Sequence, residues 1–91
     1  MKYIQEFRDG DHVAGVYLCK QKNSAVTKNG KPYDNVILQD KTGSIDCKIW
    51  DVGSAGISDF EALEILSIMA EAPAEGDQLL LSLAMHDERK R

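Results

Sequence analysis

The feature that most constrains the fold is a tight turn, Asp40-Lys41-Thr42-Gly43, flanked on both sides by alternating apolar and polar residues. Asp commonly opens such a turn, and Gly supplies the positive φ that closes it. Residues 33–39 and 44–50 are therefore predicted to form two antiparallel strands of one hairpin.

The two faces of this hairpin differ in chemistry, because successive side chains of a strand point to opposite faces. One face is apolar and is predicted to enter the core; it carries Val36, Leu38, Ile45, Cys47 and Ile49. The other face mixes two aromatic rings with polar and charged groups; it carries Tyr33, Asn35, Ile37, Asp46, Lys48 and Trp50.

Turn signals divide the rest of the chain. A β-rich strand is predicted at residues 12–22, with a bulge or bend at Gly15, and the polar stretch at residues 23–32 is predicted to be a loop. Ser58-Asp59-Phe60-Glu61 has the pattern of a capping box, which predicts a short helix. Strands at residues 65–72 and 78–85 follow.

The order strand, strand, strand, short helix, strand, strand is typical of the OB-fold, an all-β five-stranded Greek-key barrel with a helix between its third and fourth strands. An SH3-like barrel is the alternative, but it does not normally have a capped helix at that point. With 91 residues the chain is predicted to be one OB-fold domain, with a core at about residues 10–86 and a frayed, charged end at residues 87–91.

Charge is distributed unevenly along the sequence. Residues 1–50 carry eight Lys or Arg against six Asp or Glu, a balance of +2, whereas residues 51–91 carry three against nine, a balance of −6. The overall charge of −4 therefore conceals a basic segment at residues 20–48, while the negative charge is concentrated in residues 51–91.

Several functional classes are excluded by missing motifs. Nucleophile-elbow, phosphate-loop and zinc-ligand spacings are absent, so neither catalysis nor a metal or other cofactor is predicted. Cys19 and Cys47 are expected to be free thiols. No apolar run, the three leucines at residues 79–81 included, comes near the length needed to span a membrane, and we expect a soluble cytoplasmic protein.

Three stretches resemble one known family. Residues 28–33 (Lys-Asn-Gly-Lys-Pro-Tyr), residues 38–43 and residues 45–51 are similar to the N-terminal, anticodon-binding-type OB domain of YhaM-type 3′-5′ exoribonucleases, as is the opening segment at residues 9–16. The resemblance covers about residues 1–70. In that family a separate HD phosphohydrolase domain performs hydrolysis, so what the resemblance implies for this chain is binding of single-stranded RNA or DNA. The acidic hairpin at residues 71–77 departs from the family pattern and would repel phosphate.

The mixed face of the hairpin is the predicted binding site. Trp50 and Tyr33 would stack on bases, Lys48 shares their face, and Asn35 would hydrogen-bond a base edge. Four further lysines are predicted to contact the phosphates: Lys20, Lys22, Lys28 and Lys31.

Two other functions stay open. The chain is alternatively an interaction module that packs on a partner catalytic domain or forms a homo-oligomer through barrel edges and the apolar strand at residues 79–83; the net acidity favours this reading. An oligosaccharide-binding barrel would also use Trp and Tyr, although the resemblance does not support it.

Overall fold

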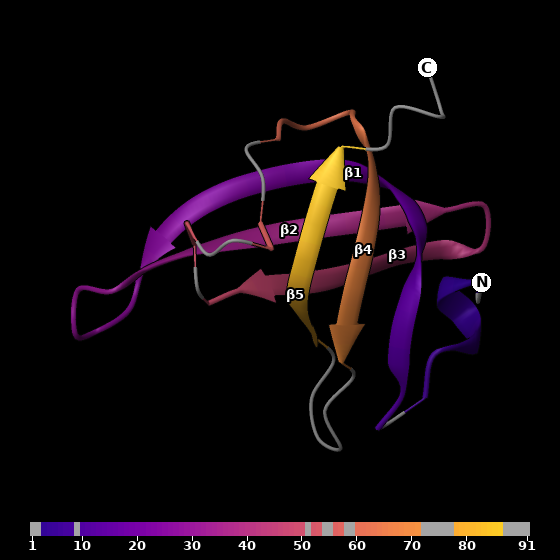
Figure 1. Cartoon of the computed structure of the whole chain (residues 1–91), viewed down its shortest axis with the longest axis horizontal. Coiled ribbons are helices and arrows are strands. Elements are labelled where there is room, and N and C mark those ends of the chain that lie inside the picture. Colours follow the sequence, from indigo (N-terminus) through magenta and orange to yellow (C-terminus); the bar gives the residue numbers. More distant parts are fainter. Residues whose placement is uncertain are drawn as a thin grey trace.

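The computed structural model describes residues 3–8, 10–50, 52–53, 56–57, 60–71 and 78–86. Five strands close into a barrel in the order β1-β2-β3-β5-β4, and β4 and β5 run across β2 and β3 (Figure 1). The closed five-stranded barrel confirms the predicted OB-fold. The elements are η1, a 3-10 helix (Ile4–Glu6), β1 (His12–Val26), β2 (Pro32–Asp40), β3 (Gly43–Ile49), β4 (Ile65–Glu71) and β5 (Gln78–His86).

Strand β1 is shared by both halves of the barrel. Its first part, residues 12–18, pairs with β4, and its second part, residues 18–26, pairs with β2. The register shifts between Cys19 and Gln21, so the bulge lies at Lys20, and the prediction of an irregularity at Gly15 was wrong. Gly15 pairs regularly with Ile68, whereas the bulge falls where the strand leaves one partner for the other and must bend (Figure 1).

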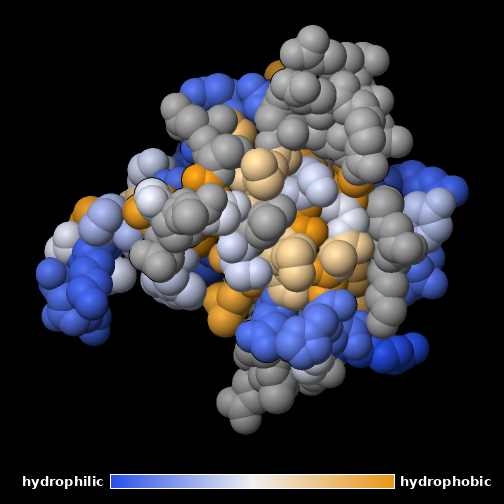
Figure 2. Space-filling model, in the orientation of Figure 1, coloured by the Kyte–Doolittle hydropathy of each residue, from blue (hydrophilic) through white to orange (hydrophobic). Residues whose placement is uncertain are grey.

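The first hairpin is longer than predicted. Residues 23–26 continue β1 and pair with residues 32–35 of β2, so the prediction of a loop from residue 23 was wrong. Backbone hydrogen bonds to β2 outweigh the polar composition of this segment. The connecting loop is closed by hydrogen bonds from Gly30 N to Thr27 O and from Thr27 N to Lys31 O, both 2.9 Å, and it projects from the body as a hydrophilic arm (Figure 2).

The second hairpin confirms the predicted pairing and faces. Asp40 pairs with Gly43 at its turn, and the apolar face enters the core. Val36, Leu38, Cys47 and Ile49 are each at most 1% exposed, and Ile45 packs at the edge of the core. Cys19 and Cys47 are free, buried thiols; burial raises the pKa of both, that of Cys47 to about 12.

The predicted helix between the third and fourth strands is absent from the described residues there, so this prediction was wrong. Residues 60–64 form a turn in which Leu63 has a φ of 74°, which no right-handed helix allows. Leu63 N donates to Cys19 O at 2.6 Å, and Cys19 N donates to Glu64 O at 2.8 Å. These bonds to β1, with Phe60 buried in the core, override the local helix signal. Ser58 and Asp59 of the expected capping box lie outside the described residues.

The N-terminal helix η1 lies beside the β2–β3 turn (Figure 1). Ile4 N donates to Asp40 Oδ2 at 2.8 Å, while Thr42 donates to Asp40 Oδ1 from its amide N at 2.7 Å and its Oγ1 at 2.6 Å. Partial burial acts to raise the pKa of Asp40, but hydrogen bonds from Thr42, Ile4 and Gly43 outweigh it and lower that pKa. Asp40 therefore joins the N-terminus to the turn as a carboxylate.

Two predicted segments lie largely or wholly outside the described residues. Of the acidic hairpin at residues 71–77, only Glu71 is described, at the end of β4, and the charged C-terminal residues 87–91 lie outside the described part. In the described part of the chain, no helix has the length and apolar character needed to cross a membrane.

Candidate functional site

The outer face of the sheet β1–β2–β3 is the candidate site, here called the platform face. Directly paired residues of antiparallel strands share a face, so the register places its side chains in rows across the strands. One row is Gln21, Ile37 and Asp46, and the next is Asn23, Asn35 and Lys48. Ala25 pairs with Tyr33 in the third row. The sheet thus presents three rows of chemically different groups.

Tyr33 and Trp50 form the aromatic end of the platform face. Asp34 pairs with Ile49, so Trp50 follows β3 at the position opposite Tyr33. The ring centroids are 4.9 Å apart and the ring planes are inclined by 39°. Trp50 is 51% exposed, so a large part of the indole remains accessible to a stacking partner.

Lys48 and Asn35 are joined beside the aromatic rings. The Lys48 ammonium donates a hydrogen bond to Asn35 Oδ1 and lies 5.0 Å from the Tyr33 ring centroid. The structure therefore brings together four of the predicted site residues: Tyr33, Asn35, Lys48 and Trp50.

Three of the remaining lysines are exposed at the margins. Lys28 and Lys31 lie in the loop between β1 and β2, two to five residues from Tyr33, and Lys20 is the bulge residue of β1. Lys28 and Lys31 add positive charge to the loop that forms the hydrophilic arm seen in Figure 2. They do not contact the aromatic pair directly in any described hydrogen bond or ring contact.

Lys22 is not brought to the platform face. The bulge at Lys20 changes the alternation, so that Lys22 pairs with the buried Val36 and shares its side of the sheet. The ammonium donates to Phe60 O at 2.7 Å and lies 4.1 Å from the Phe60 ring centroid. Lys22 therefore holds the turn before β4 against β1.

Sequence reasoning missed two residues of the platform face, Gln21 and Asn23. Both are exposed, and both are on this face because β1 continues past the bulge. The period-two pattern Gln21, Asn23, Ala25 was the available signal. With Asn35, Asp46 and Lys48, Asn23 lines a hollow of about 260 Å³ next to the aromatic pair.

The groups of this face are stacking, charged and hydrogen-bonding side chains. Within the described residues, no three His, Cys, Asp or Glu side chains are grouped so as to hold a metal ion. The face provides an exposed aromatic surface, a fixed cation and amide groups that donate and accept hydrogen bonds, which is the set used to hold a flexible polyanion with stacking rings.

Comparison with known proteins identifies relatives of this chain. Over 70 residues, 77% of the chain, it is 34% identical to the 3′-5′ exoribonuclease YhaM of Geobacillus sp. (strain WCH70) and 30% identical to that of Listeria monocytogenes serotype 4b (strain CLIP80459). The match spans 22% of each relative's length. No family model and no solved structure matches the chain. Over most of its length the chain is thus a homologue of a segment of the YhaM 3′-5′ exoribonucleases, and the resemblance predicted from its hairpin residues is confirmed.

Proposed function

We propose that this chain binds single-stranded RNA or DNA on its platform face and holds it for a nuclease activity located in another part of a longer protein. The observation that carries this proposal is the exposed Tyr33–Trp50 pair with the Lys48 ammonium beside it. Similarity to exoribonucleases supports a role in handling nucleic acid. Because the matched segment is less than a quarter of those proteins, the nuclease activity can lie in another part of a longer chain.

Binding would combine two contributions. Bases stack on Trp50 and Tyr33, each worth about 1–3 kcal/mol and largely independent of base identity. Lys48, Lys31, Lys28 and Lys20 neutralise phosphates and release counterions, so that affinity falls as salt rises. Lys22 is left out, since its ammonium is engaged by Phe60.

Trp50 is the only tryptophan of the chain, so its fluorescence reports directly on the platform face. We expect oligo(U) and oligo(dT) to quench this fluorescence at low salt and to bind several-fold more weakly at about 0.2 M salt. Absence of any change at high micromolar strand would reject independent binding.

A lysine variant tests the electrostatic part. Lys31→Gln should lower the slope of log affinity against log salt by about 0.7, the value for one phosphate contact on a single strand. Lys41→Gln is the matched control, because Lys41 lies on the β2–β3 turn with its ammonium 4.7 Å from the Tyr3 ring centroid. An equal change of the salt slope in both variants would show that total charge alone sets the affinity and that the strand does not pass over Lys31.

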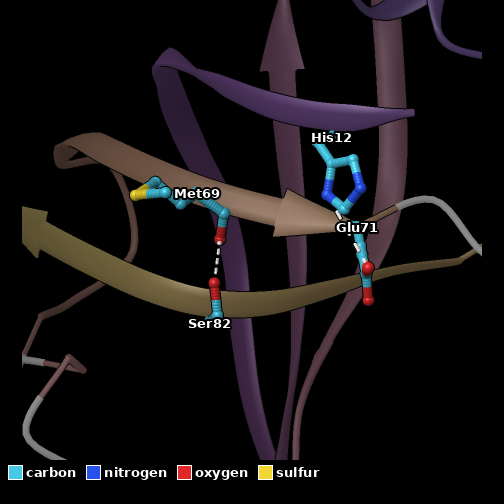
Figure 3. Close-up of polar contacts among 4 residues, drawn as sticks. All are labelled: His12, Met69, Glu71 and Ser82. Carbon is cyan, nitrogen blue, oxygen red and sulfur yellow. Dashed lines mark hydrogen bonds and ion pairs between the residues drawn. The ribbon is translucent and has the colours of Figure 1, made fainter.

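A second candidate function rests on the outer face of β1, β4 and β5. Met69 is 52% and Met85 48% exposed there, and an apolar patch covers β4 and β5 (Figure 2). Ala14, Leu80 and Ser82 help to line a hollow of about 350 Å³ beside Met69, with the His12–Glu71 pair at one end (Figure 3). Half-exposed methionines on a sheet are common where another protein surface packs.

This second candidate is an interaction module that packs on another protein chain through the Met69 face. The apolar strand expected to mediate pairing does not serve as an edge, since Leu79 and Leu81 are in the core and β5 pairs with both β3 and β4. Light scattering distinguishes the candidates: self-association that resists salt, is lost in Met69→Glu and persists in Trp50→Ala would favour the interaction module.

A further inference from the structure

The platform face contains one carboxylate that simple phosphate binding does not explain. Asp46 is exposed in the first row, opposite Ile37, and lines the hollow with Asn35 and Lys48. Among the described residues its carboxylate has no hydrogen-bond or ion-pair partner. A free carboxylate repels phosphate, so a nucleic-acid strand on this face must present something other than its backbone to Asp46.

The three polar groups of the hollow have complementary hydrogen-bonding roles. An ionised carboxylate only accepts hydrogen bonds, through two oxygens, and an ammonium only donates. Asn35 uses Oδ1 to accept from Lys48, which leaves its NH₂ group free to donate. The hollow thus offers one bidentate acceptor in one row and two donors in the next row.

Among the four RNA bases, guanine fits this pattern best. Its N1–H and N2–H₂ are neighbouring donors that a carboxylate accepts together, and its O6 accepts from an amide or ammonium. Uracil has a single N–H between two carbonyl oxygens, whereas adenine and cytosine each have one amino group beside an acceptor nitrogen. None of these three can fill both carboxylate oxygens from one edge.

The geometry points to a guanine-reading subsite: we propose that Asp46 accepts from the N1–H and N2–H₂ groups of a guanine while Asn35 and Lys48 donate to its acceptor atoms. This inference rests on the proposed function. Residues of one face repeat about every 6.6–6.8 Å along a strand, so Asp46 lies about 13 Å from Trp50. The guanine is therefore a different nucleotide from the one stacked on the indole, and the platform face adds a base preference to sequence-independent stacking.

The test is competition against a labelled uridine oligonucleotide by fluorescence anisotropy. The competitors are unlabelled uridine oligomers of equal length with one central guanosine, adenosine or inosine. We expect the guanosine oligomer to bind roughly tenfold more tightly than the adenosine oligomer, the discrimination of one good bidentate pair. Inosine lacks the N2 amino group and should lose most of that advantage.

Variants assign the preference to Asp46. Asp46→Asn should bind the all-uridine oligomer as tightly as the wild type or more tightly, because a negative charge is removed, while its guanosine preference falls below about threefold. Glu61→Gln is the control; it removes one charge from the exposed turn before β4 and should keep the full preference. Circular dichroism would verify that both variants fold.

The outcomes separate this inference from the proposed function. Salt-sensitive binding of all oligomers with equal affinity would overturn the guanine subsite and leave the proposed function standing. Full guanosine preference in Asp46→Asn would also overturn it. If no oligonucleotide binds, both proposals fail.

Discussion

The ammonium of Lys22 lies 4.1 Å from the centre of the Phe60 ring and donates a 2.7 Å hydrogen bond to the carbonyl oxygen of the same residue. One lysine therefore contacts both the backbone and the side chain of the residue that enters the core just before β4. This contact is structural, and it separates Lys22 from the other lysines assigned to phosphate.

Replacement of Lys22 should affect stability more than binding. Lys22→Met keeps an unbranched side chain but loses the charge-assisted hydrogen bond and the cation–π contact, so the free energy of unfolding should fall by about 1–3 kcal/mol. Urea denaturation measures this loss. Lys31→Met, in the exposed loop, should change stability by less than about 0.5 kcal/mol. Equal stability of the two variants would contradict the structural role of Lys22.

Replacement of Trp50 should show the opposite pattern. Trp50→Ala removes a half-exposed ring, so the unfolding free energy should fall by less than about 2 kcal/mol, mostly through the lost contact with Tyr33. Affinity for labelled oligo(U) should drop roughly tenfold or more, because a stacked base contributes about 1–3 kcal/mol. Fluorescence anisotropy of the labelled strand measures the affinity of the wild type and of Trp50→Ala. Met69→Ala on the opposite side serves as control, and an equal drop there would argue against a local site.

Leu63 offers a prediction about backbone strain. It is 76% exposed and has a φ of 74°, a region where a β-carbon is unfavourable by about 1–2 kcal/mol. Leu63→Gly should relieve this strain, lose little buried surface, and raise the unfolding free energy by about 0.5–1 kcal/mol after the entropic cost of glycine.

The neighbouring residue provides the control for that change. Ala62 is also exposed but does not have a positive φ, so Ala62→Gly should lower the unfolding free energy by about 0.5–1 kcal/mol. Thermal or urea unfolding gives both values. The prediction is that Leu63→Gly raises the unfolding free energy and Ala62→Gly lowers it. A lower unfolding free energy in both variants would refute the strain at Leu63.

Asp40 should make stability depend on acid pH. Its pKa is lower in the folded protein than the ordinary value of 3.8, so its stabilising contribution is fully present above about pH 3.8 and is lost as the pH falls through the lower, folded-state pKa. Asp40→Asn should weaken the attachment of η1 at neutral pH by about 1–2 kcal/mol and should lose less further stability in acid than the wild type.

Urea unfolding across this pH range compares the two proteins. Thr42→Val removes one side-chain donor to Asp40 and should reduce the acid dependence less than Asp40→Asn does. Parallel pH curves for the wild type and Asp40→Asn would show that the carboxylate hydrogen bonds do not stabilise the fold.

The parts of the fold that sequence reasoning predicted are those set by local rules. The β2–β3 hairpin follows from the Asp40–Gly43 turn and strict alternation, so its faces, and with them the positions of Tyr33 and Trp50, could be predicted. The bulge at Lys20 could not, because it is set by where β1 changes partners, not by residue type. That one residue reverses the alternation and turns Lys22 toward the side of Val36, away from the platform face. Asn23 was missed for a different reason, because residues 23–32 were predicted to be a loop.

The expected helix after residue 58 was also wrong because contacts between distant residues override a local sequence pattern. A capping-box pattern around Ser58 and Glu61 favours a helix by only about 1 kcal/mol. The backbone bonds from Cys19 to Leu63 and Glu64, and the burial of Phe60, are long-range contacts that the local pattern does not reveal.

The double pairing of β1 also determines which pieces of this chain are complete. A fragment that ends after β3 would still contain the platform face, but the first part of β1 would lack β4 and expose an open edge with Val13 and Tyr17 uncovered. During synthesis on the ribosome, the ring can close only after β4 and β5 have emerged. Shortening this module from its C-terminal side into these strands would therefore yield an aggregation-prone half-barrel, so its smallest useful form must extend through β5.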